Sequence, residues 1–174
     1  MGLKEATAEK HKLAERMPFN GRMFRGELSK KEYLHYLNQQ ASIFQIIELK
    51  GVPHKSLLRL KNVFEDIQEL GKEVKDTLPV LKSMEKYGVY LQKLTYEQIL
   101  PHIYLHYFAI MFGGQMMKSK VPGSGRMYDF DDMMEAAGSI RAVQKDEWAD
   151  EVNKAFDFMI EIFDELERLH TPAK

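Results

Sequence analysis

The sequence predicts an all-α protein that forms a single domain over residues 1–174. Its apolar residues recur at the spacing of amphipathic helices, and no strong β-strand alternation appears. A chain of 174 residues with 44% hydrophobic residues is long and apolar enough to bury one core. The clearest helical stripe, near the C-terminus, consists of Val152, Phe156, Met159, Phe163 and Leu166.

Capping and stop signals set the expected helix boundaries. Ser29 and Glu32 have the spacing of a capping box, and Gly51 ends the helix that this box begins. Thr95 and Gln98 form a second box ahead of a long helix. The expected helices cover roughly residues 2–15, 29–50, 54–70, 72–86, 95–118, 130–142 and 146–169, with a loop at 122–125.

Composition excludes several classes of function. The chain has no cysteine, which rules out disulfides, thiolate metal sites and cysteine nucleophiles. A formal net charge of −1 argues against nucleic acid as the main partner. No stretch approaches the roughly 20 apolar residues of a membrane span, and the charged N-terminus shows no signal peptide. We therefore expect a soluble, cytoplasmic protein with no nucleic-acid or membrane partner.

A histidine on the first predicted helix is a candidate metal ligand. Lys4, His11 and Glu15 share one helix face, because residues three and four apart are neighbours. Glu15 can accept a hydrogen bond from one ring nitrogen of His11 and leave the other for a metal. Lys4 lies about 10 Å away along the helix axis, a distance that suits a cation reaching the carboxylates of a bound macrocycle. The alternative is a surface histidine on a charged helix.

Two successive glycines mark the helix expected over 95–118. Each glycine in a helix costs about 1 kcal/mol relative to alanine, so Gly113 and Gly114 suggest a kink or close approach to a flat ligand. Ala109 extends the surface of small residues by one turn. The alternative is close packing of two helices.

His102 and His106 also share a helix face, with no carboxylate between them. A di-metal carboxylate bundle takes Glu-x-x-His pairs from two helices, and we expect none here. We interpret both histidines as partly buried or surface residues.

These patterns, taken in order along the chain, resemble the heme oxygenase family. The residues that carry the resemblance are 3–7, His11, Ala14, Glu15, Phe19, 26–29, Glu32, Tyr33, 36–39, Tyr104, 106–108, 113–115, Lys118, Val152, Asn153, Ala155, Phe156 and 163–166.

The resemblance implies a helical bundle that holds heme between its first helix and a glycine-kinked distal helix. The activity it implies is the opening of heme to biliverdin with release of CO and ferrous iron, using O2 and electrons. Heme is then both substrate and cofactor. Ferredoxin or a flavoprotein reductase would supply the electrons, and a bilin reductase would be a downstream partner.

The resemblance also assigns roles near the iron. His11 would be the proximal iron ligand, supported by Glu15. Ala109, Gly113 and Gly114 would let the distal helix lie over the heme face, with His11 and the two glycines as the catalytic set.

The resemblance assigns four further residues to the heme pocket. Lys4, Tyr104 and Arg141 would bind propionates, although the match at Arg141 needs a gap in the alignment. Phe156 would line the pocket wall.

Two positions depart from the family. Ile110 stands where the family has an aspartate that orders proton-delivering water, and Phe44 replaces a tyrosine on the second helix. Three interpretations follow. Either another polar group, His106 or Gln39, organises the water, or the enzyme is slow, or the protein only binds heme as a carrier or sensor.

Three other classes are alternatives, and the sequence rules out the second of them. A non-heme di-iron oxidase shares the broad architecture and would be tested by iron analysis of protein purified without heme. A thiamin-degrading enzyme of related shape would need a cysteine nucleophile, which the chain lacks. A helical interaction module is the third.

Overall fold

The computed structural model describes residues 1–171, and every regular element in this range is helical. This confirms the predicted all-α class. The α-helices are α1 (Leu3–Ala6), α2 (Ala8–Arg16), α3 (Pro18–Phe24), α4 (Lys30–Lys50), α5 (Leu60–Gly71), α6 (Lys82–Gln92), α7 (Tyr96–Phe108), α8 (Met133–Val143) and α9 (Ala149–His170).

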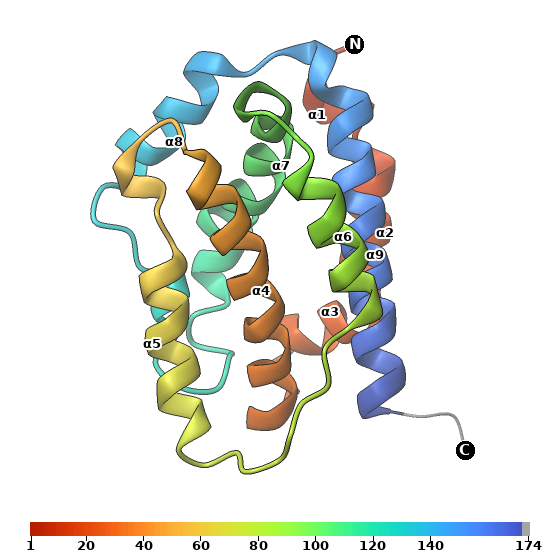
Figure 1. Ribbon diagram of the computed structural model, residues 1–174, viewed down its shortest axis with the longest axis vertical. Helices are drawn as coiled ribbons and strands as arrows, with labels where there is room; N and C mark the ends of the chain where they lie inside the picture. The colour runs from red at the N-terminus through yellow and green to blue at the C-terminus, as the bar shows by residue number, and fades with distance from the viewer. Residues whose placement is uncertain (172–174) are drawn as a thin grey trace.

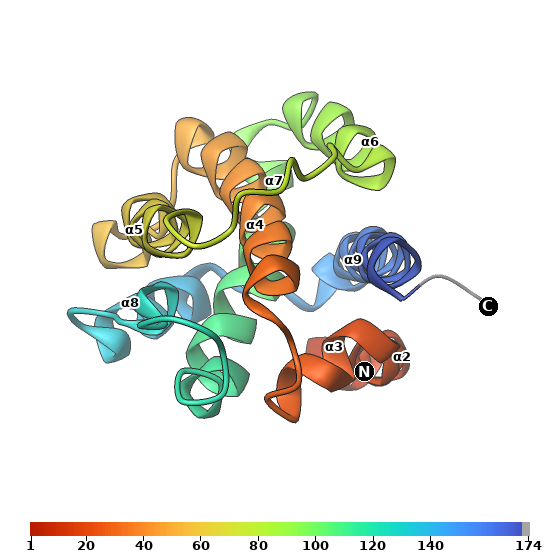
Figure 2. The same cartoon turned by 90° about the horizontal axis from the view of Figure 1, so that it is seen from below.

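Helix α4 occupies the middle of the bundle. Figure 2 shows α5 and α8 on one side of it and α6 and α9 on the other, with α2 and α3 beside α9. Ile43, Phe44 and Ile47 on α4 are completely buried. The long helix α9 runs alongside α2 (Figure 1). Among residues 1–171, no helix combines the length and apolar character that crossing a membrane requires.

Both predicted capping boxes are present. The Ser29 hydroxyl accepts from the Glu32 backbone N–H at 3.1 Å, and the Glu32 carboxylate accepts from the Ser29 N–H at 3.0 Å. Thr95 and Gln98 make the same pair of bonds at the start of α7. Gly51 has φ = 116°, a backbone conformation that favours glycine, and it ends α4 as expected.

The expected first helix over residues 2–15 is divided. Helix α1 ends at Ala6, and the Leu3 carbonyl accepts from both the Thr7 backbone N–H at 3.1 Å and the Thr7 hydroxyl at 2.9 Å. Pro18 then begins α3, which the sequence did not distinguish; proline is well tolerated at a first helical position.

The predicted position of the helix over residues 72–86 is wrong. The chain is irregular through most of 72–81, and α6 begins only at Lys82. Glu165 of α9 explains this start, because its carboxylate accepts from the backbone N–H groups of Lys82 at 3.1 Å and Ser83 at 2.9 Å. The acceptor that begins α6 is therefore far away in the sequence.

The single helix predicted over 54–70 is divided into a short 3₁₀ turn at Lys55–Leu57 and helix α5, which begins at Leu60. Glu48 of α4 caps the start of α5. Its carboxylate accepts from the N–H groups of Arg59 at 2.8 Å and Leu60 at 3.2 Å. It also accepts from the Tyr107 hydroxyl at 2.9 Å, which ties α7 to α4. One part-buried carboxylate thus joins three helices, α4, α5 and α7.

We predict that Glu48→Ala lowers the free energy of unfolding by roughly 2–4 kcal/mol, because it leaves three part-buried donors without their acceptor. Urea unfolding measures this change. Glu161→Ala is the matched control, since Glu161 contacts only the exposed Lys86 among the described residues; we expect a change within about 0.5 kcal/mol. Equal losses in both variants would contradict the role of Glu48.

Candidate functional site

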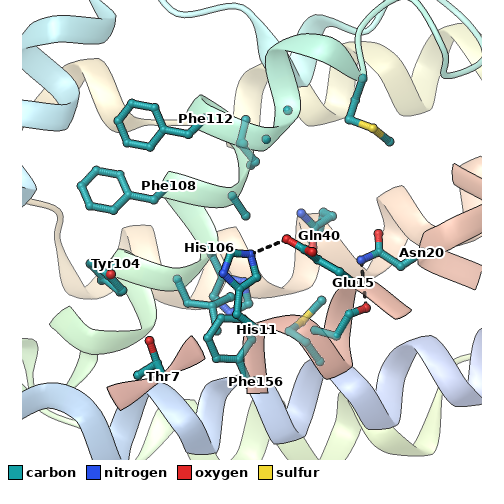
Figure 3. Close-up of a pocket in the computed structure, with 18 of the residues that line it drawn as sticks. Thr7, His11, Glu15, Asn20, Gln40, Tyr104, His106, Phe108, Phe112 and Phe156 are labelled. Atoms are coloured by element: carbon teal, nitrogen blue, oxygen red, sulfur yellow. Dashed lines mark hydrogen bonds and ion pairs between the residues drawn. The ribbon is translucent and has the colours of Figure 1, made fainter. Parts of the chain in front are cut away.

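A cavity of about 550 Å³ lies between α2, α4, α9 and the segment that follows α7. This volume falls in the usual range for small-molecule sites, roughly 300–1,000 Å³. Figure 3 shows its lining side chains. The residues predicted from the sequence as site residues all line it: Lys4, His11, Glu15, Tyr104, Ala109, Gly113, Gly114, Arg141 and Phe156.

His11 projects from α2 on one wall of the cavity. Its Nε2 lies 2.8 Å from the Glu15 carboxylate, one turn further along the helix. The imidazole stacks on Phe156 of α9, with ring centroids 5.5 Å apart and planes inclined by 19°. The His11 side chain is 57% exposed. The contact with Glu15 fixes the ring and leaves the other nitrogen for a ligand.

The opposite wall is the segment that continues α7. Residues Ala109–Gly113 form a π-helix (η2), followed by a short 3₁₀ turn at Gly114–Met116 (η3). π-Helical turns are rare and are frequent at functional sites. The sequence predicted a kink at Gly113 and Gly114, and the departure from α-helical geometry begins four residues before Gly113.

The two glycines differ in their surroundings. A Cβ added to Gly113 would have no atom within 4 Å, so this glycine leaves open space along the cavity. A Cβ added to Gly114 would lie 2.6 Å from Cδ1 of Tyr128. Gly114 is therefore needed for close packing on Tyr128, which was the alternative interpretation of the pair.

Positive charge lies at the rim of the cavity. The Arg141 guanidinium lies over the rings of Phe108 and Phe112, 5.0 and 5.5 Å from their centroids. Lys4 lines the same cavity and is exposed. Burial raises the pKa of Tyr104, and the charge of Arg141 offsets only part of that rise. The phenol is therefore protonated near neutral pH.

His102 and His106 belong to a buried hydrogen-bonded chain. The Tyr87 hydroxyl lies 2.7 Å from Nδ1 of His102 and 2.8 Å from Nε2 of His106. Nε2 of His102 lies 2.8 Å from the Glu151 carboxylate. Both histidines are almost completely buried, so the expectation of partly buried or surface residues is wrong. Tyr87 and Glu151 lie on other helices, and no local pattern could reveal them.

The positions that lack the family's polar groups are apolar and buried. Ile110 lines the cavity, and Phe44 is completely buried in α4. Gln39, one of the two polar candidates, lies outside the cavity wall and donates to the His35 carbonyl at 2.8 Å. The neighbouring Gln40 lines the cavity instead.

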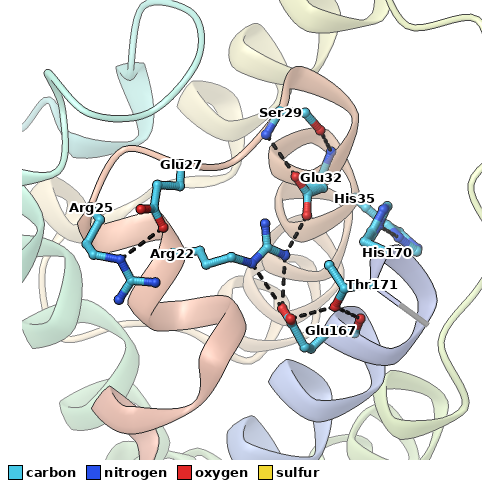
Figure 4. A network of polar contacts seen from close by, with 9 residues as sticks. All are labelled: Arg22, Arg25, Glu27, Ser29, Glu32, His35, Glu167, His170 and Thr171. Atoms are coloured by element: carbon cyan, nitrogen blue, oxygen red, sulfur yellow. Dashed lines mark hydrogen bonds and ion pairs between the residues drawn. The ribbon is translucent and has the colours of Figure 1, made fainter. Parts of the chain in front are cut away.

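The sequence does contain two Glu-x-x-His pairs, Glu32 with His35 and Glu167 with His170, contrary to expectation. They face each other across α4 and α9 (Figure 4). The Arg22 guanidinium already lies between both carboxylates, at 2.5 and 2.9 Å. Within the described chain, no three His, Asp or Glu side chains are arranged to hold a metal ion.

We predict opposite effects of alanine at the two glycines. Gly114→Ala should lower the free energy of unfolding by roughly 1–3 kcal/mol, because its Cβ overlaps Tyr128. Gly113→Ala should leave it unchanged or raise it by up to about 1 kcal/mol, since nothing obstructs the new Cβ. Thermal unfolding of the pair measures both, and a loss of stability in Gly113→Ala would contradict the open surroundings of that residue.

The sequence matches the heme oxygenase family over residues 1–138. No curated protein matches the chain. The fold is similar to heme oxygenase-1 from Synechocystis sp. PCC6803 in complex with heme, with a TM-score of 0.80 and 20% identity over 95% of this chain and 90% of that one. Heme oxygenase-2 of the same cyanobacterium, in complex with heme and NO, gives 0.81 and 20% over 96% and 84%.

Heme oxygenase from Leptospira interrogans gives a TM-score of 0.77 with 22% identity over 95% of this chain and 100% of that chain. At these identities the structural likeness concerns the fold alone. The match over residues 1–138 covers most of the chain, and the chain therefore belongs to the heme oxygenase family.

Proposed function

We propose that the protein binds heme in this cavity and opens it to biliverdin, with His11 as the axial ligand of the iron. One observation carries the proposal: His11, in contact with Glu15, lines the same cavity as the small residues Ala109 and Gly113. The imidazole supplies a nitrogen ligand, and the opposite wall leaves room for a flat molecule. Family membership supports the same activity.

The other wall residues fit the chemistry of heme. Phe156 and other apolar side chains of α9 offer a dry surface to the ring. Lys4, Tyr104 and Arg141 provide donors and positive charge for propionates. Bound heme is the substrate and also supplies the iron that activates O2. The chain's own groups bind it, orient it and exclude water from it.

Electrons must come from a separate protein. We place ferredoxin or a flavoprotein reductase in this role, with a bilin reductase acting on the product. The exposed cations Lys4 and Arg141 line the cavity, and the exposed Lys145 follows Gln144, which also lines it; these charges suit the approach of an acidic donor.

A heme carrier or sensor is the second candidate, because Ile110 and Phe44 offer no hydrogen bonds to distal water. A turnover assay separates the two functions. The protein is mixed with hemin, ferredoxin, ferredoxin reductase and NADPH, with catalase present. Loss of the Soret band and recovery of biliverdin supports the oxygenase. A stable complex without bilin, while a known heme oxygenase turns over in the same mixture, would favour the carrier.

We predict that His11→Ala removes the spectrum of histidine-ligated heme, since the other histidine in the cavity lining, His106, is already bonded to the buried Tyr87 hydroxyl. Absorption and resonance Raman spectra of the ferrous complex measure this. His54→Ala is the control, because His54 is a partly exposed histidine outside the cavity. An unchanged spectrum in His11→Ala would exclude it as the ligand.

A further inference from the structure

The buried chain of side chains runs from the cavity toward the protein surface. His106 forms part of the cavity wall, Tyr87 and His102 are completely buried, and the Glu151 side chain is 25% exposed. Contacts of 2.8, 2.7 and 2.8 Å join His106 to Tyr87, Tyr87 to His102 and His102 to Glu151. These hydrogen-bonded side chains thus connect the cavity to the Glu151 carboxylate on α9.

When both imidazoles are neutral, only one assignment of donors and acceptors satisfies every hydrogen bond in this row of four side chains. The hydrogen bond from His102 lowers the pKa of Glu151, which is a carboxylate and can only accept. Nε2 of His102 therefore carries the proton, and its Nδ1 accepts from the Tyr87 hydroxyl.

The order continues to the cavity. The Tyr87 oxygen donates its one proton to His102 and accepts from Nε2 of His106. Nδ1 of His106 then carries no proton. Burial lowers the pKa of His106 to about 3, so the ring is neutral at physiological pH. Within the described residues Nδ1 makes no hydrogen bond, and it is the acceptor that remains for the cavity.

A second polar group on the cavity wall lacks a partner. Gln40 is 3% exposed, and its Oε1 is buried without a hydrogen bond in the described chain. Its Nε2 has only the sulfur of Met127, at 3.9 Å. A buried amide oxygen is unfavourable when it is left unpaired, and a water molecule in the cavity would give it a donor.

His106 and Gln40 lie close in sequence to Ile110 and Phe44, the two apolar residues at positions where the family has polar groups. His106 on α7 precedes Ile110 of the π-helix η2 by four residues, and Gln40 precedes Phe44 by four residues on α4. Residues four apart lie on the same helix face. On both helices a polar side chain therefore stands one turn before the position where the family's polar group is missing.

We propose that His106 is a positioning residue that orders water on the distal side of the cavity, the side opposite His11, together with Gln40. Glu151 acts through His102 and Tyr87 to hold His106 in the tautomer that accepts at Nδ1. The proposal rests on the heme oxygenase function proposed above and names the groups that replace the lost water anchors.

The tautomer is tested on the heme-free protein by long-range ¹H–¹⁵N NMR of the histidine rings. We expect His106 to be protonated at Nε2 alone. Tyr87→Phe should shift both ¹⁵N resonances of His106, because the ring loses its partner. Tyr90→Phe is the matched control, since Tyr90 also binds Glu151 but makes no contact with His106. A proton on Nδ1 of His106, or an imidazolium at His102, would overturn the proposal.

Turnover of the heme complex tests the positioning role. His106→Leu and Tyr87→Phe should each slow biliverdin formation about tenfold while the His11-ligated spectrum is retained. The double variant should be no slower than His106→Leu, because Tyr87 acts through His106. Tyr90→Phe should change the rate less than twofold. If the wild type forms bilin and these variants match it, only the positioning role fails. If the wild type forms no bilin, the proposed function itself fails.

Discussion

The cavity depends on the buried and part-buried hydrogen bonds that fix α7 among its neighbours. Tyr107 donates to Glu48 of α4, His102 contacts Glu151 of α9, and Tyr87 of α6 contacts both histidines. Buried polar groups are unfavourable without partners, so these contacts select one position and rotation of α7. Apolar packing alone would tolerate small rotations of α7 about its axis. Each such rotation would turn Ala109 and Gly113 away from the cavity.

A fixed α7 also explains how its continuation can leave the α-helical form. The π-helix at Ala109–Gly113 replaces the α-helical hydrogen bonds by bonds between residues five apart, and Gly113 adds conformational freedom. Such a segment keeps one arrangement only when its surroundings define it. The α7 contacts hold one end, and the packing of Gly114 on Tyr128 holds the other. The small, open surface along the cavity is therefore supported from both ends.

Local interactions account for what the sequence predicts well. The capping boxes at Ser29 and Thr95 and the face shared by His11 and Glu15 involve residues three or four apart. The sequence fails where a distant residue decides the outcome. Glu165 begins α6 from another helix, and Glu151 orders the histidines of α7. Choosing Gln40 over Gln39 requires knowing which side of α4 faces the cavity.

The proposed water-ordering role of His106, four residues before Ile110, differs chemically from the role of an aspartate. An ionised aspartate accepts hydrogen bonds through two oxygens, and its function does not depend on a tautomer. A neutral histidine accepts through one nitrogen only, and which nitrogen is set by the hydrogen bond at the other. A histidine in this position must therefore be held by a partner that removes the choice. Tyr87 is such a partner, and the carboxylate of Glu151, beyond His102, gives the chain its direction.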